Sequence, residues 1–423
     1  MKSFVQATIF AIVAIPSQVH AQKQSTLNID SCFSWAKQNY PLIRQADLIQ
    51  KSTVYSVENA SKGLLPQITV NGSATYQSDV TSFPISIPNV KVPTISKDQY
   101  KLYAELNQPL TDVYAIRRQE ALVKANAAVE QQKLETELYK IKERITQLYF
   151  AVLLLNEQET QQQLLLKDIK ASLEKMKVAV SNGTASQMNQ YLLEAEFVKA
   201  KQRLTEIQSG KKGYLQMLAT FISKDLDETT LFETPTLLVE NTNNNRPELK
   251  QYSAQKAAIA ASGKLTDTKL IPRVFLFAQG GYGRPALNML NNEFKLYGIG
   301  GVKVGWNLSA FYTRKNDKQL IELSKMQVEA QEQTFQLNTN ISVAQQNTEY
   351  DKINELLKDD ASLVILRSQV KQSANVQLEA GTISALDLVN YINAEDQAKQ
   401  ALLLHKIQLL QAAYTKQLTL GNL

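Results

Sequence analysis

Two pairs of short segments alternate apolar and polar residues, as β-strands with one face in water do. From Ile68 to Tyr76 every second residue is apolar, small or aromatic, and the residues between them are Thr, Asn, Ser and Thr. The segment before Pro109 repeats the alternation, and two later segments keep the same parity. The pattern predicts strands over about 66–78 and 99–109, and over about 272–283 and 295–308.

The strand parity places Glu105 and Lys303 on the polar face, at equivalent points of the second and fourth strands. About 9–11 alternating residues suit a tilted transmembrane strand, and aromatic residues near strand ends suit a membrane interface. Tyr76, Tyr282 and Trp306 occupy such ends. We therefore expect Glu105 and Lys303 to line the lumen of a barrel, with an ordinary soluble hairpin as the alternative.

Each strand pair is followed by a run that favours one uninterrupted helix. Neither Gly nor Pro occurs from Leu110 to Asn182 or from Trp306 to Ala380, and these two residue types are the usual helix breakers. A helix of about seventy residues extends ~100 Å. Apolar residues from Leu134 onward follow heptad spacing, so we predict coiled-coil hairpins over 111–221 and 310–420.

Both predicted hairpins turn at a glycine, Gly183 or Gly381, which can adopt the left-handed conformation that ends a helix. Ser186 and Ser384 then stand where they can cap the returning helices. Asn189 and Asp387 follow three residues later, a variant of the capping-box spacing.

The sequence contains an internal duplication. Short motifs recur at constant spacing, with one change of offset at a loop: 39–41 match 245–247, 65–66 match 271–272, and 183–186 match 381–384. We infer a first structural repeat over 22–221, a linker over 222–244, and a second repeat over 245–423.

The first residues predict export. Lys2 precedes an apolar run from Phe4 to Ile15, and small residues follow at a cleavage site, so we interpret 1–21 as a signal peptide. An anchor helix is the alternative, but the run is too short to cross ~30 Å of hydrocarbon. The formal charge of +6 is dispersed along the chain and offers no nucleic-acid footprint.

Candidate chemistry is sparse. Cys32 is the only cysteine, and His405 is the only histidine after residue 21. A histidine-based triad would have to rest on His405 alone, in an apolar helical stretch that favours a packing role, and no cysteine cluster offers a zinc site. No Gly-rich phosphate loop follows a strand. The sequence therefore predicts a protein that is not an enzyme and has no cofactor.

The order of helix, strand pair, long helix, Gly turn and returning helix, given twice, resembles the TolC family of outer-membrane efflux proteins. The resembling motifs are 106–112 with 304–311 and 182–190 with 380–388. The resemblance implies a mainly α fold with β, in which four strands per chain contribute to a homotrimeric transmembrane β-barrel continued by a periplasmic helical tunnel. Some oligomer is required independently, because four strands are fewer than the eight of the smallest outer-membrane barrels.

The resemblance also implies a passive channel-tunnel in outer-membrane lipid, with a periplasmic extension. It would work in a tripartite export complex with a periplasmic adaptor and an inner-membrane pump, moving small molecules or secreted proteins. Two alternatives remain: a periplasmic coiled-coil adaptor, and an all-helical structural protein.

Site residues carried over by the resemblance lie at the Gly turns. Adaptors are expected to dock there, on Asn182, Gly183, Thr184, Ala380, Gly381 and Thr382, with the threonine hydroxyls as hydrogen-bonding groups. Asp387 matches one acidic position of the family's periplasmic gate, whereas Asn390 stands at the second and Ile383 replaces an arginine. We therefore predict a gate held mainly by helix packing, with Asp387 setting a weak cation preference or acting only as a helix cap.

Overall fold

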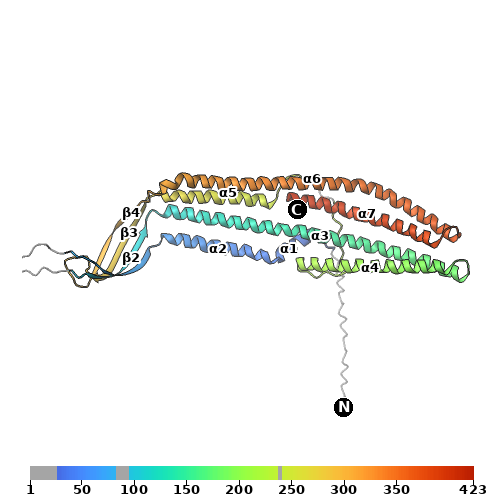
Figure 1. Cartoon of the computed structure of the whole chain (residues 1–423), viewed down its shortest axis with the longest axis horizontal. Helices are drawn as coiled ribbons and strands as arrows, with labels where there is room; N and C mark the ends of the chain where they lie inside the picture. Colours follow the sequence, from blue (N-terminus) through green and yellow to red (C-terminus); the bar gives the residue numbers. More distant parts are fainter. Residues whose placement is uncertain (1–25, 82–94, 237–240) are drawn as a thin grey trace, which may run out of the picture.

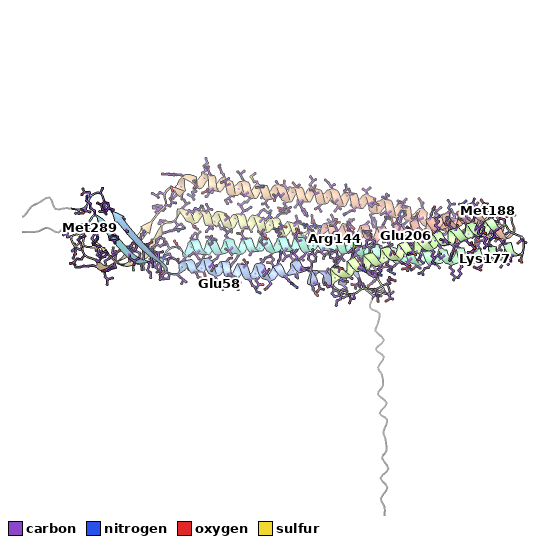
Figure 2. All side chains as sticks on the ribbon, turned by 60° about the horizontal axis from the view of Figure 1, so that its bottom comes forward. Glu58, Arg144, Lys177, Met188, Glu206 and Met289 are labelled. Atoms are coloured by element: carbon purple, nitrogen blue, oxygen red, sulfur yellow. The ribbon has the colours of Figure 1, made fainter. Side chains whose placement is uncertain are left out.

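The computed structural model describes residues 26–81, 95–236 and 241–423 (Figure 1). The predicted signal segment 1–21 and part of the predicted linker lie outside these residues. The molecule is a long rod with a small sheet at one end and two helical turns at the other. Met289, between the last two strands, and Met188, beside the first turn, mark these opposite ends (Figure 2).

The first half of the chain forms two short helices, a strand pair and a helical hairpin. Its elements are α1 (Ile29–Asn39), α2 (Arg44–Ser61), β1 (Gln67–Tyr76), β2 (Asp98–Pro109), α3 (Val113–Ser181) and α4 (Gln187–Ile222). Short 3₁₀ helices at Pro41–Ile43 and Lys62–Leu64 join the first three.

The second half repeats this order with one short helix fewer. Its elements are α5 (Pro247–Thr266), a 3₁₀ helix at Asp267–Leu270, β3 (Arg273–Arg284), β4 (Lys295–Gly305), α6 (Ala310–Glu379) and α7 (Ala385–Leu420). The duplicated, mainly α fold with four strands is therefore confirmed.

α2, α1 and α4 follow one another along α3, and α5 and α7 follow one another along α6 (Figure 1). The end of α4 meets α1, where Asn39 donates a hydrogen bond to the carbonyl oxygen of Ile222 at 3.0 Å. The end of α7 meets the start of α5, where the amide of Asn245 donates to the carbonyl oxygen of Leu420 at 2.7 Å. These junctions allow four helices to run side by side over most of the rod.

The largest apolar core lies at mid-length, around α3. Tyr149 and Ile145 are fully buried there, and α1 contributes Cys32 and Phe33. The hydroxyl of Tyr149 lies 2.7 Å from the carbonyl oxygens of both Leu27 and Glu233. Two smaller clusters continue along α3 toward the turns, as the heptad spacing predicts.

The four strands form one antiparallel sheet in the order β1-β2-β3-β4. Within the described residues no helix is both long enough and apolar enough to cross a membrane.

Candidate functional site at the tip and on the sheet

The two turns at the tip have the same backbone geometry. Gly183 and Gly381 have φ angles of 75° and 73°, which glycine adopts without steric cost. The next amide, of Thr184 or Thr382, donates back to the carbonyl oxygen five residues earlier, at 2.9 Å in both turns. This bond closes a Schellman motif that satisfies the last carbonyls of α3 and α6.

The threonine hydroxyls serve the turns themselves. Thr184 Oγ1 donates to the carbonyl oxygen of Ala179 at 2.9 Å, and Thr382 Oγ1 donates to that of Gln377 at 3.0 Å. Each hydroxyl has a single hydrogen, and these bonds use it. Their oxygens remain available as acceptors.

The returning helices are capped differently. Ser384 accepts from the amide of Asp387 at 3.2 Å, and Asp387 Oδ2 accepts from the amide of Ser384 at 3.0 Å, which completes a capping box. Ser186 occupies the equivalent position before α4, but its side chain makes no capping hydrogen bond. The predicted cap is thus present at Ser384 and absent at Ser186, since Asn189 does not close a box as Asp387 does.

Asp387 and Asn390, the predicted gate residues, are both exposed. Hydrogen bonds from the hydroxyl and amide of Ser384 hold the pKa of Asp387 below its usual value. Asp387 is therefore a charged cap residue at the tip.

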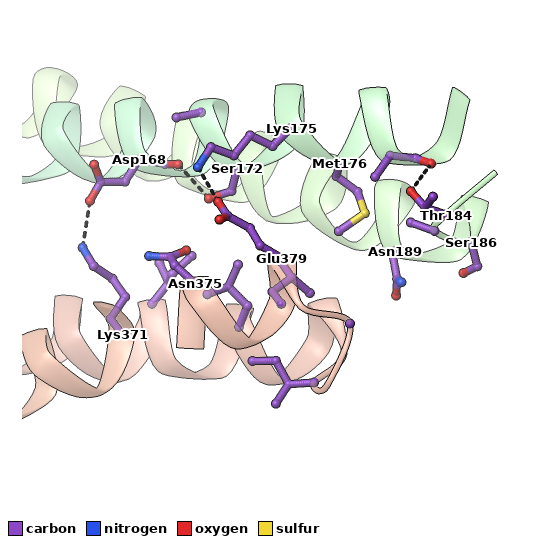
Figure 3. A pocket seen from close by; sticks show the side chains of 18 residues that line it. Asp168, Ser172, Lys175, Met176, Thr184, Ser186, Asn189, Lys371, Asn375 and Glu379 are labelled. Atoms are coloured by element: carbon purple, nitrogen blue, oxygen red, sulfur yellow. Dashed lines mark hydrogen bonds and ion pairs between the residues drawn. The ribbon is translucent and has the colours of Figure 1, made fainter. Parts of the chain in front are cut away.

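A groove of about 540 Å³ lies between the two hairpins near the tip (Figure 3). Lys371 of α6 crosses it, with its Nζ 2.9 Å from Asp168 Oδ2 of α3 and 2.6 Å from Glu395 Oε2 of α7. Lys399 binds the other oxygen of Glu395 at 2.9 Å. Closer to the turns, Lys175 and Glu379 form a second, exposed pair at 2.7 Å between α3 and α6.

The buried members of this network are ionised. Burial raises the pKa of Glu395, but hydrogen bonds from Lys371 and Lys399 outweigh it and hold that pKa below its usual value. Burial likewise lowers the pKa of Lys371, and its bonds to Glu395 and Asp168 reverse the effect. The hairpins are thus joined by ion pairs as well as by packing.

At the other end of the rod the sheet has two different faces. Glu105 lies opposite Thr69 and Gln279, and Lys303 lies opposite Phe275. Facing residues in a ladder share a face, and so do residues two apart along a strand. Glu105 and Lys303 are therefore on one face, which we call the polar face.

The opposite face is apolar and exposed. It carries Ile68, Val70, Leu102, Leu106, Leu276, Val302 and Val304, each at least 37% exposed. A surface of this composition is suited to lipid, with the polar face turned toward water.

Sequence reasoning missed the Lys371 network entirely. Lys371 and Asp168 are 203 residues apart, and neither stands in a recognisable motif. The only available signal is that position 371 of the second repeat is a lysine near the predicted gate, which by itself indicates a solvated helix face.

Comparison with known proteins supports the resemblance. The family described as outer membrane efflux protein matches residues 33–218. This match covers less than half of the chain and lies within the first repeat. No curated protein matches it significantly.

Solved outer-membrane channels share the fold over nearly the whole chain. VceC from Vibrio cholerae is 15% identical, with a TM-score of 0.67 and coverage of 93% of this chain and 96% of its own. The Campylobacter jejuni channel CmeC is 12% identical, with a TM-score of 0.66 and coverage of 93% of this chain and 85% of its own. The open state of MtrE from Neisseria gonorrhoeae is 15% identical, with a TM-score of 0.66 and coverage of 93% of this chain and 88% of its own.

The match and the shared fold support an efflux channel-tunnel of the outer membrane with a periplasmic extension. The matched family is one of passive channels rather than of enzymes. The alternatives of an adaptor and a structural filament are not favoured.

Proposed function

We propose that three copies of this chain join their sheets into one barrel and their helices into one tunnel. The sheet of a single copy ends at β1 on one side and β4 on the other. Lipid tolerates no open strand edge, since unpaired backbone groups cost several kcal/mol there. Three copies bring together three times four strands, enough to close a barrel.

The assembled tunnel acts as a passive conduit in a tripartite complex for small molecules or secreted proteins. An adaptor docks at the tip on Asn182–Thr184 and Ala380–Thr382, and an inner-membrane pump supplies the energy. Support comes from the open space beside the glycines: a Cβ placed on Gly183 or Gly381 would meet no atom within 4 Å. Another backbone can therefore approach these turns closely.

Reconstitution tests the conduit. The detergent-extracted oligomer should migrate more slowly before heating than after, because heating releases single chains. It should also conduct ions in planar bilayers without hydrolysing nucleotides. Consistent lack of conductance by correctly assembled oligomers contradicts the proposal.

Replacing both tip glycines tests the docking. In Gly183→Asn with Gly381→Asn the turns should persist, because Asn tolerates left-handed backbone, while the added bulk should abolish adaptor crosslinking and export. Gly213→Asn is the matched control, since Gly213 also faces open space but lies within α4. Unchanged export in the double variant refutes docking at the turns.

We further propose that the tip is the gate and that Asp387 gives it a weak preference for cations. The exposed, charged carboxylate supports this role. Asp387→Ala should reduce the effect of divalent cations on conductance, whereas a residue that only caps α7 should leave that effect unchanged.

A further inference from the structure

Four side chains on the polar face of the sheet form a compact group that the export role leaves unexplained. Tyr103 of β2 and Tyr297 of β4 both lie opposite Gly281 of β3, and Lys101 and Lys295 both lie opposite Gly283. Because Gly281 and Gly283 are two residues apart, all four side chains share one face in two adjacent rows. We call these four residues the tyrosine–lysine belt.

Both tyrosines crowd the position where Gly281 lacks a side chain. A Cβ placed on Gly281 would lie 2.6 Å from Tyr103 Cβ and 2.8 Å from Tyr297 Cζ. The missing side chain thus leaves room in which the Tyr297 ring approaches the sheet surface beside the Cβ of Tyr103. Both tyrosines remain partly exposed, so aromatic surface is still open to the space in front of the sheet.

The lysines add positive charge beside this aromatic surface. Lys101 makes no ion pair within the described residues, and its Cγ would lie 3.1 Å from a Cβ on Gly283. Lys295 lies 3.2 Å from Glu293, but both side chains are more than half exposed. An exposed pair of this kind contributes about 0–1 kcal/mol, so a passing anion can compete for Lys295.

We infer that the tyrosine–lysine belt is a binding station for aromatic anions moving through the barrel. Planar rings stack on tyrosine with favourable offset or edge geometry, while acidic groups on the same molecule meet the ammonium groups one row away. The inference rests on the proposed assembly, in which the polar face lines the lumen and the belt is repeated in every copy. It assigns a substrate class, planar anionic compounds, to a channel whose fold alone specifies none.

The alternative is that the tyrosines have only a structural role, since an aromatic ring can shield an exposed glycine of a strand. That role predicts a loss of assembly when the rings are removed and predicts no ligand. The experiment therefore needs a binding readout on assembled protein.

The probe is pyranine, a trisulfonated pyrene dye that is too polar to enter neutral detergent micelles. Its fluorescence anisotropy should rise on addition of the wild-type oligomer, and citrate, a non-aromatic anion, should displace it poorly. Tyr103→Leu with Tyr297→Leu keeps apolar bulk over Gly281 but removes both rings, and it should raise the Kd at least about tenfold, equivalent to 1.4 kcal/mol. Lys101→Gln with Lys295→Gln should also weaken pyranine binding.

The matched control is Tyr100→Leu with Tyr282→Leu, which removes two tyrosines of the same sheet, on β2 and β3, from the opposite face. It should bind pyranine like the wild type. If the belt variant fails to assemble, Tyr297→Leu alone retains Tyr103 beside Gly281. This single variant should still bind pyranine with a higher Kd than the wild type.

Unchanged binding in the assembled belt variants, or equal losses in the control, overturns the inference. So does a wild-type oligomer that conducts ions but binds no pyranine, an outcome that leaves the channel function standing. An oligomer that neither conducts nor binds refutes the proposed function itself.

Discussion

The two long helices have nearly the same length and opposite surroundings. α3 has 69 residues and α6 has 70, yet fourteen residues of α3 are buried and only five of α6. The fully buried Ile145, Tyr149 and Ile169 all belong to α3. On α6 large apolar residues such as Leu323 and Leu337 are each 59% exposed.

The difference follows from position. α3 packs against α1, α2, α4, α5 and α7, whereas among the described helices α6 packs mainly against α5 and α7. α3 is thus the central helix of the chain, and α6 is an outer helix with one side uncovered. An apolar stripe on such a helix marks an interface, which in the proposed oligomer would be with the next copy of the chain.

The largest effect on assembly is expected when charged residues replace exposed leucines of α6. Leu323→Asp with Leu337→Asp puts two carboxylates, two heptads apart, into the proposed contact between copies, where each unpaired buried charge costs several kcal/mol. The oligomer should be lost, as judged by crosslinking and by migration before heating.

The control for this variant is Gln331→Asp with Asn338→Asp. These residues line a groove with Tyr252 of α5 and should tolerate charge. Equal oligomer yields in both double variants would show that α6 is not a subunit edge.

The next effect is expected where the two repeats are tied together. Lys371→Met removes the cation between Asp168 and the buried Glu395, and breaking a buried ion pair costs about 3–5 kcal/mol. The contact between the two hairpins should loosen, and conductance in bilayers should increase several-fold. Lys175→Met is the matched control, because its pair with Glu379 is exposed and contributes about 0–1 kcal/mol.

The same network sets a pH dependence. A carboxylate whose folded-state pKa is depressed stabilises the fold above its unfolded value, 4.5 for Glu395, and loses that contribution as the pH falls through the folded value. The tip should therefore stay closed at neutral pH and open only under acidic conditions below about 4.5. A wild-type channel that opens between pH 8 and 6 would contradict this assignment.

A smaller effect is expected on the sheet, where the repeats differ in the sign of one charge. Glu105→Lys should shift the ion selectivity toward anions and Lys303→Glu toward cations, while oligomer yield stays within about 1 kcal/mol of wild type. The exchanged double variant should return close to the starting selectivity. Cysteine labels at 105 and 303 that react only from the lipid phase would place this face outside.

The smallest effect distinguishes the two caps. Ser384→Ala should destabilise the first turn of α7 by about 1 kcal/mol, whereas Ser186→Ala should change α4 by only a few tenths. Hydrogen exchange of the first-turn amides measures both. Equal protection losses would show that the capping box at Asp387 contributes nothing.

Much of the architecture was predictable because it depends on local pattern. Alternation from Ile68 to Tyr76 specifies a two-faced strand, and the lack of Gly and Pro over α3 and α6 specifies unbroken helices. Gly183 and Gly381 specify the turns, since few other residues adopt a φ near 75°. Each of these signals is contained within a few residues of the feature it predicts.

The rest was decided only when distant segments came together. No local pattern pairs Lys371 with Asp168 and Glu395, aligns Tyr103 and Tyr297 across Gly281, or buries α3 while leaving α6 exposed. Two similar helices acquire different roles because one is surrounded by its own chain and the other is not. Burial, ion pairing and cross-strand register depend on which neighbours the fold supplies, and a sequence pattern describes only the side chains that each segment offers.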